Sequence, residues 1–247
     1  MENKPKPYNL FLILFILGAV SGLLLTALST WADLESAYYG FARRASARLS
    51  GFSCPVLMTA NESNVISLKV KNTTDGKLSP AIRVSTSSPV TAFEFTDNLE
   101  LAAGESATRE WSVGPENLDL KRFIFANALV YSSYPLPDRE MTCGIFVLKL
   151  PGSGGVYTAL LVLVSLLGMG AGLYGVYQAQ GPEQSGVDVA RQLMFMAVIV
   201  AFGLVTAFMG WWLQGMLTLV VAILFVLIAA GLLINRSTHK NGNPHTR

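Results

Sequence analysis

The spacing of uncharged apolar blocks constrains this chain more than any other feature of its sequence. Leu10–Leu28 stands alone near the N-terminus, and three further blocks, Val156–Tyr177, Leu193–Met209 and Leu213–Ile234, crowd the C-terminal part. Each block has about the length that an α-helix needs to cross the ~30 Å hydrocarbon core of a bilayer. Lipid cannot satisfy free backbone groups, so helices are the form expected for such runs. The sequence therefore predicts four transmembrane helices, with one large polar segment between the first and the second.

The composition agrees with membrane insertion. Hydrophobic residues make up 51% of the 247-residue chain and charged residues only 14%, against about 25% in soluble domains. Lys4, Lys6 and the faint cleavage pattern Ala27-Leu28-Ser29 also fit a cleaved signal peptide. The first block is longer than the ~7–15-residue core of such a peptide, so a retained anchor is the favoured interpretation.

Lysine and arginine placement predicts the orientation of the helices. Four spans put 1–9, 178–192 and 235–247 on one side, and these short segments carry Lys and Arg more densely than the other side. Basic segments stay in the cytoplasm, although Arg43, Arg44 and Arg48 argue mildly the other way. We expect cytoplasmic N- and C-termini in a plasma (cytoplasmic) membrane, with the large segment extracytoplasmic.

The two cysteines support this orientation. Cys54 and Cys143 are the only ones in the chain, and both lie in the large segment. In an oxidising compartment such a pair forms a disulfide, whereas the alternative is two reduced, buried thiols in a cytosolic domain. The disulfide is favoured, and a bridge closing so long a loop stabilises a domain by ~4 kcal/mol in the chain-entropy account.

Residues 29–50 are predicted to form a juxtamembrane amphipathic helix. Apolar residues recur there at three- and four-residue steps, at Leu34, Tyr38, Phe41, Ala45 and Leu49. Thr30 and Asp33 resemble an N-terminal capping pair. This helix either packs under the next domain or continues the first span, or it lies in the interface with its arginines on lipid phosphates. The first interpretation is favoured because the basic charge is modest.

Residues 51–150 are predicted to form an antiparallel β-sandwich. Asn64–Asn72 alternates between apolar and polar residues, and about eight short strands follow one another at the spacing of a sandwich. Leu101–Thr108, just before Trp111, resembles the turn into a late strand of bacterial immunoglobulin-like adhesion modules, which implies a fold and no function. The expected fold class is thus a membrane protein of α+β type, with four transmembrane helices and an immunoglobulin-like extracytoplasmic sandwich between helices 1 and 2.

The segment 123–131 is apolar on both faces, unlike an antiparallel strand with one wet face. It is either a central strand covered on both sides or a face that docks on a partner or on the membrane helices. Aromatic and proline residues follow in a loop whose tip suits a partner contact, although ordinary turn packing is favoured. The candidate contact residues are Phe123, Phe125, Tyr131, Tyr134 and Leu136.

Small residues recur four apart in the apolar blocks, which lets helix backbones approach closely. Contact among the four helices of one chain is favoured over a dimer seam. The candidate packing residues are Gly18, Gly22, Gly168, Gly172, Gly175 and Gly203.

The sequence lacks the residues of most catalytic and cofactor sites. The only histidines, His239 and His245, lie in the C-terminal tail, which leaves none for a serine triad, a blue-copper or typical zinc centre, or haem. No nucleotide-binding motif or basic run is present, so cofactors, metals and nucleic acid are not expected. An enzyme working through carboxylates alone, such as Glu94, Asp97 and Glu100, is the weakest hypothesis.

Asn61 and Asn72 each begin an Asn-x-Ser/Thr pattern in the external segment and are candidate glycosylation sites. The same pattern at Asn235 is expected on the cytoplasmic side and unmodified.

Two hypotheses for function follow. The first is a non-enzymatic membrane subunit whose sandwich binds or positions a partner, within an assembly of other membrane proteins or copies of itself in the bilayer. The second is a transport or mechanotransmission subunit whose segment 178–192 contacts a separate ATPase. In topology the chain resembles claudin-like proteins, without their Trp and Cys signature, and the ABC-transporter permeases of cell division and macrolide export.

Overall fold

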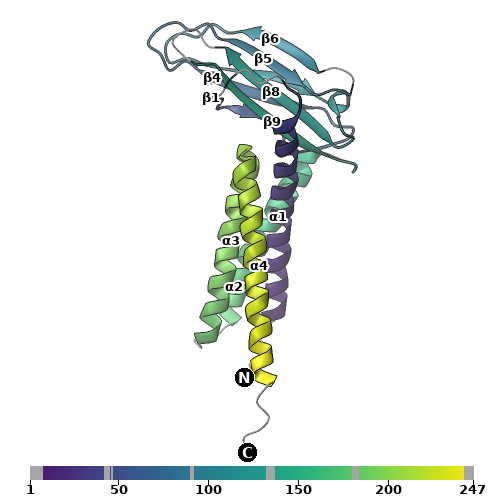
Figure 1. The fold of residues 1–247 in the computed structure, drawn as a ribbon, viewed down its shortest axis with the longest axis vertical. Helices are drawn as coiled ribbons and strands as arrows, with labels where there is room; N and C mark the ends of the chain where they lie inside the picture. Colours follow the sequence, from purple (N-terminus) through teal and green to yellow (C-terminus); the bar gives the residue numbers. More distant parts are fainter. Residues whose placement is uncertain are drawn as a thin grey trace, which may run out of the picture. The chain divides into compact units, whose positions relative to one another are not determined.

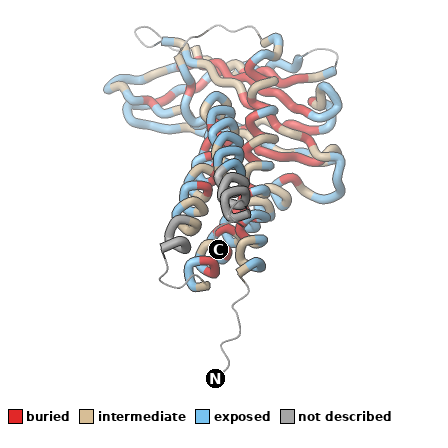
Figure 2. The backbone as a smooth tube through the Cα atoms, turned by 60° about the horizontal axis from the view of Figure 1, so that its bottom comes forward, coloured by how far each residue is buried: buried red, intermediate tan, exposed pale blue. Residues whose placement is uncertain are grey.

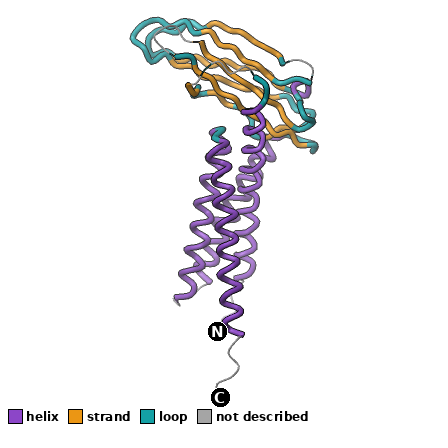
Figure 3. Tube along the Cα trace, viewed as in Figure 1, coloured by secondary structure: helices purple, strands orange, loops and turns teal. Residues whose placement is uncertain are grey.

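The chain is α+β and divides into two compact units. The computed structural model describes residues 8–41, 45, 47–89, 92–131, 137–179 and 184–241, with the backbone only for 184–188 and 232–241. The helical unit contains Met1–Ala27, Val162–Thr206 and Leu213–Arg247, and the β unit contains Leu28–Leu161 and Ala207–Trp212. The expected combination of long apolar helices with a sheet-rich domain is confirmed (Figures 1 and 3).

The described residues form four long α-helices: α1 (Tyr8–Tyr38), α2 (Gly154–Ala179), α3 (Gln184–Met209) and α4 (Trp212–Asn241). Each is long and apolar enough to cross a membrane. Every helix extends beyond the apolar block that predicts it, because an α-helix continues through polar residues that carry no breaker.

The amphipathic helix predicted over 29–50 is not a separate element: its first part, to Tyr38, continues the first span, as the favoured interpretation allowed, and the prediction of a helix at Ala47–Arg48 is wrong. Neither Gly nor Pro interrupts the chain between Leu28 and Tyr38, so α1 runs on without a break to Tyr38. Thr30 and Asp33 therefore lie inside a helix and do not cap one, and Ala47–Arg48 is a strand. The predicted cytoplasmic loop 178–192 is also shorter than expected, since α3 already begins at Gln184.

In the helical unit, glycines allow close backbone contact between α1 and α2. A β-carbon built on Gly18 would lie 2.6 Å from the backbone nitrogen of Met169, and one on Gly168 would lie 2.9 Å from the carbonyl oxygen of Leu14. Both distances are too short for a real side chain. Gly22, Gly172 and Gly175 make equally close approaches between helices, and Gly203 of α3 faces Thr26 of α1 and Thr218 of α4. These contacts all lie within one chain.

The outer faces of these helices are apolar and exposed. On α4 the side chains of Ile223, Leu227 and Ile228 are 61–63% exposed, and α1 to α3 carry many similar residues. Figure 2 shows buried residues concentrated in the strands and exposed residues along the helices. A soluble monomer rarely leaves so much contiguous apolar surface in water.

The β unit contains two sheets that share a core. Strands β1, β9, β8, β5 and β6 follow one another in the first sheet, with β3 also paired to β9, and the second sheet has the order β2-β4-β7. The shared core includes Ile66, Leu68, Ile82, Val84 and Ile124. The strand bounds are β1 Ala47–Arg48, β2 Phe52–Ser53, β3 Leu57–Thr59, β4 Asn64–Lys71, β5 Ala81–Thr86, β6 Phe93–Asn98, β7 Ser106–Val113, β8 Phe123–Tyr131 and β9 Arg139–Leu148.

A disulfide joins the two sheets. Cys54 follows β2 of the second sheet, and its partner Cys143 lies on β9 of the first. Their Cα atoms are 6.5 Å apart, and 89 positions of sequence separate them. The bridge therefore links the segment that enters the β unit to the strand that leads out of it.

The end of α1 fills a gap in the edge of the first sheet. β1 pairs with Arg139–Glu140 and β3 with Phe146–Leu148, so that the middle of β9 has no strand on that side among the described residues. There the carboxylate of Asp33 accepts a hydrogen bond from the N–H of Gly144 (2.9 Å), and the hydroxyl of Ser36 donates to the carbonyl of Cys143 (2.8 Å). A β-carbon on Gly144 would collide with the carbonyl of Ala32, so only glycine admits the helix here.

Glu62 organises the start of α2. Its carboxylate accepts hydrogen bonds from the N–H groups of Gly154 (2.7 Å) and Thr59 (2.9 Å) and from the hydroxyl of Ser153 (2.8 Å). Burial acts to raise the pKa of Glu62, but these hydrogen bonds outweigh it and hold the pKa below its ordinary value of 4.5. A carboxylate at a helix N-terminus also satisfies N–H groups that the helix cannot pair itself.

Two neighbouring glycines of α2 give a matched test of the helix contact. We expect Gly168→Ala to destabilise the helical unit by about 1–3 kcal/mol, because its methyl group has no room against Leu14 and Gly18. Gly170→Ala is the control, since nothing lies within 4 Å of its β-carbon. Thermal unfolding in detergent measures both; equal melting temperatures for the two variants would show that the contact is not tight.

Because the pKa of Glu62 is lowered, we expect the β unit to lose stability in acid. Its lowered pKa means that it stabilises the fold above the ordinary glutamate pKa, and that this stabilisation is lost as the pH falls through the lowered value. We expect the difference in melting temperature between the native chain and Glu62→Gln to shrink between pH 6 and pH values below ~4. The exposed Glu110→Gln serves as a control and should show a small difference at every pH.

Candidate functional site

A cleft of about 400 Å³ lies within the β unit. Its volume lies within the ~300–1,000 Å³ of small-molecule sites. We call it the basic cleft. It is lined by Leu49, Ser50, Gly51, Lys69, Val70, Lys71, Thr73, Leu78, Pro80, Val130 and Arg139.

The cleft exists because β2 is short. β2 pairs with Leu68 and Ser67 of β4 and then ends, so only the carbonyl of Gly51 remains to accept the N–H of Lys69 (3.0 Å). Gly51 has φ +88, and a β-carbon there would meet the carbonyl of Lys69, so this position requires glycine. Beyond it no described strand pairs with β4 on this side, and residues of both sheets line the cleft there, among them Lys71 of β4 and Val130 of β8.

Alternation along β4 sets which groups face the cleft. Lys69 N–H points to the side of β2, whereas Asn72 N–H points to β7, where it donates to the carbonyl of Glu105 (2.8 Å). Successive residues of a strand direct their backbone groups to opposite sides. The N–H of Lys71 is therefore directed to the side where β2 has ended.

The charge of the cleft is one-sided. Lys69, Lys71 and Arg139 line it, and none of the described lining residues is acidic. In the part of the chain that the structure describes, none of the three forms an ion pair, while Lys77, Arg83 and Arg109 each have an acidic partner. Three cations and a directed N–H can bind an anion, and the described lining contains no carboxylate, imidazole or thiol.

The partner contacts predicted at Phe123 and Phe125 are wrong. The two rings are only 2% and 0% exposed. β8 lies between β5 and β9, with one face on the shared core and the other under Ala32, Tyr39 and Phe146. The strand is apolar on both faces because the end of α1 covers the face that water would otherwise reach. Tyr131 is half-buried at the end of β8, and Tyr134 and Leu136 lie outside the described residues.

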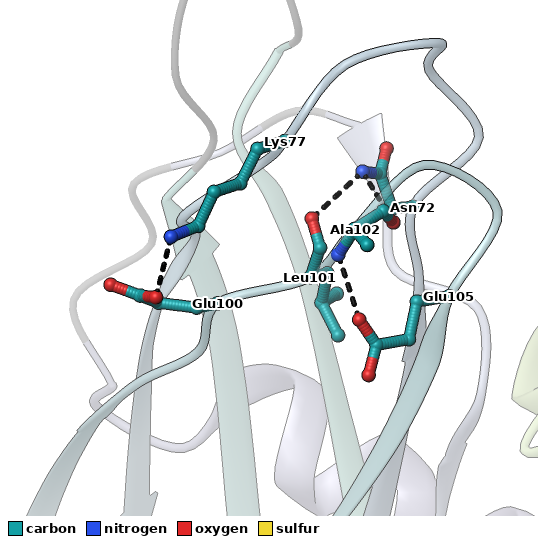
Figure 4. Close-up of polar contacts among 6 residues, drawn as sticks. All are labelled: Asn72, Lys77, Glu100, Leu101, Ala102 and Glu105. Atoms are coloured by element: carbon teal, nitrogen blue, oxygen red, sulfur yellow. Dashed lines mark hydrogen bonds and ion pairs between the residues drawn. The ribbon is translucent and has the colours of Figure 1, made fainter.

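Asn72 is a structural residue and not a glycosylation site. Its side chain is fully buried, and its amide nitrogen donates to the carbonyls of Gly76 (2.7 Å), Leu101 (3.1 Å) and Ala102 (3.0 Å). Figure 4 shows this amide beside the Leu101–Ala102 backbone. Its oxygen accepts from Thr74, so no atom remains for a glycan. Asn61 is exposed, and its modification stays a prediction.

The three candidate carboxylates do not form a site. Glu94 pairs with Arg83, Asp97 with Arg109 (2.6 Å) and Glu100 with Lys77 (2.7 Å; Figure 4). Each sits in its own surface ion pair. In the described ranges no group of three or more potential metal ligands occurs either.

Sequence reasoning missed the basic cleft. Lys69 and Lys71 were predicted on the solvent face of a strand, which is where alternation puts them. Lys69 and Lys71 are two residues apart, so a strand puts both on the same face, and this was the one local indication of a basic site. Arg139 is distant in sequence, and only the fold brings it to the same cleft.

Comparison with protein families and with the curated proteins gives no match for this chain. Among solved structures, the CARDB domain of the PF1109 protein from Pyrococcus furiosus aligns over 44% of this chain and 98% of that chain at 15% identity, with a TM-score of 0.32.

 A second solved structure with a likeness to this chain is the β-glucuronidase 2 of Bacteroides uniformis, with a TM-score of 0.31.

That β-glucuronidase aligns over 39% of this chain at 15% identity, and the aligned region spans 13% of its own length. Spo0M, the sporulation control protein of Bacillus subtilis, aligns over 39% of this chain and 46% of its own at 13% identity, with a TM-score of 0.29. Likenesses this distant carry no argument about function.

Asn72 gives a test of the loop that borders the β4–β7 pair. We expect Asn72→Asp to lower the free energy of unfolding by about 2–3 kcal/mol, because a carboxylate would face three carbonyl oxygens without a donor. Asn61→Asp, at an exposed position, should change it by less than about 0.5 kcal/mol. Chemical unfolding of the full chain measures both; a glycan found on Asn72 of the folded protein would contradict the assignment.

Proposed function

We propose that this chain is a non-enzymatic integral membrane protein whose extracytoplasmic, immunoglobulin-like β-sandwich binds a partner. The observation that carries the proposal is the basic cleft, an open site whose described lining has three cations and no acid, whereas Lys77, Arg83 and Arg109 of the same unit are each held in an ion pair. Its cations suit the binding of an anion, and we propose that the site binds a partner and catalyses no reaction.

The helices support insertion in a membrane. Their apolar side chains remain exposed along α1 to α4, while the contacts that they bury are with one another. In a bilayer the lipid tails would contact these exposed apolar side chains. Small residues at the buried faces allow the close packing on which helix association in membranes depends. Other membrane proteins, or copies of the same chain, are the partners expected on these faces.

The disulfide supports an extracytoplasmic β unit. Bridges persist in oxidising compartments and are rare in the cytoplasm. With four spans, an external β unit after the first helix places both termini in the cytoplasm, which agrees with the density of basic residues in the terminal segments.

The alternative function, a subunit driven by a separate ATPase, depends on segment 178–192. In the described part of the chain α2 ends at Ala179 and α3 begins at Gln184, which leaves a short connection. No observation on this segment favours the alternative over the binding protein.

Protease protection tests the orientation. The full chain with a C-terminal epitope is expressed in bacterial cells, and trypsin is added to spheroplasts. We expect cleavage within the β unit at exposed basic residues such as Lys77 and Lys149, with the epitope protected until the membrane is opened. If trypsin added outside removes the epitope and leaves the β unit intact, the orientation is the opposite of the one that we propose.

A further inference from the structure

We propose that the basic cleft binds a phosphate group carried on an apolar body, such as the headgroup region of an anionic phospholipid. This inference rests on the proposed function, because it takes the helices to span a membrane. It specifies the ligand class of the site that the proposed function leaves open.

The charge of the cleft favours phosphate over a monocarboxylate. Lys69, Lys71 and Arg139 bring three positive charges to one lining, and no acidic residue is among its described members. A phosphate monoester carries up to two negative charges and several acceptor oxygens, which match an arginine fork, point-charge lysines and the directed N–H of Lys71.

The remainder of the lining is suited to an apolar body. Leu49, Val70, Leu78, Pro80 and Val130 supply hydrophobic walls beside the three cations. A cleft of about 400 Å³ is larger than a phosphate ion needs and has room for the first atoms of an attached glycerol or acyl group. The ligand that fits both kinds of wall is an amphiphile with a phosphate head.

Contacts inside the β unit connect the cleft wall to the end of α3. Arg48, the neighbour of Leu49, donates to the carbonyls of Met209 and Gly210, each at 3.4 Å, and its guanidinium lies 5.8 Å from the ring centroid of Trp211. Tryptophan and arginine are typical of the boundary between lipid and water. The cleft wall is thus adjacent, within the β unit, to residues of the kinds that favour contact with lipid headgroups.

The test uses the full chain in a neutral detergent and titration calorimetry with three probes. These are dihexanoyl phosphatidic acid, dihexanoyl phosphatidylcholine and inorganic phosphate. We expect phosphatidic acid to bind, and the double variant Lys69→Gln/Lys71→Gln to weaken its binding by about tenfold or more. The matched control Lys121→Gln/Lys149→Gln removes two charges outside the cleft lining and should change the affinity less than about twofold.

The probes separate the two sources of phosphate. Binding of phosphatidic acid alone identifies a phospholipid, whereas cleft-dependent binding of inorganic phosphate with similar affinity identifies a soluble phosphate compound. The inference is overturned if no probe binds, if phosphatidylcholine binds as well as phosphatidic acid, or if the cleft and control variants behave alike. Equal melting temperatures of the two double variants establish that both are folded.

The two experiments distinguish a wrong ligand class from a wrong proposed function. Loss of phosphate binding with the expected protease protection removes only the ligand class. A reversed orientation in the protease experiment removes the proposed function, whatever the calorimetry shows.

Discussion

The contact between the end of α1 and the middle of β9 is the constraint on which the β unit depends. A strand flanked by two short parallel partners leaves polar backbone groups between them, and such groups must be paired if they are buried. Asp33 and Ser36 pair them from a helix, and Gly144 gives the helix room to do so. The same helix covers Phe123 and Phe125, so one contact closes both the edge and the outer face of the sheet.

The sequence predicts much of the secondary structure because local patterns determine it. The apolar blocks identify all four described helices, and the predicted segment 123–131 coincides with β8. The errors arise where a distant partner decides the outcome. Hydropathy ends the first block at Leu28, yet α1 continues to Tyr38, where its polar residues meet β9. Nothing local shows that Asp33 has a partner at Gly144.

The same reasoning explains which site residues sequence analysis assigns incorrectly. Asn72 has a glycosylation pattern and lies in a turn, both of which indicate exposure, but it is buried, and its amide donates to Gly76 of its own turn and to Leu101 and Ala102 of the segment between β6 and β7. Phe123 and Phe125 are hydrophobic enough for an interface, and the protein uses them in an interior. Lys69 and Lys71 have the pattern of an ordinary wet strand face. Their importance depends on the early end of β2 and on Arg139, neither of which local alternation contains.

The distribution of charge gives a reason to regard the cleft as more than the open end of a sandwich. Lys77, Arg83 and Arg109 are held in ion pairs, and Arg48 and Arg122 lie over indole rings. Five described cations of the β unit, Lys69, Lys71, Lys121, Arg139 and Lys149, have neither kind of partner, and three of them share one lining. Like charges gathered without an acid repel one another, which costs stability unless a bound anion or counterions offset it. Of the seven described cations of the β unit outside the cleft, five are held by an acid or an indole ring, whereas none of the three in the cleft is, and this contrast is what the proposed anion site would explain.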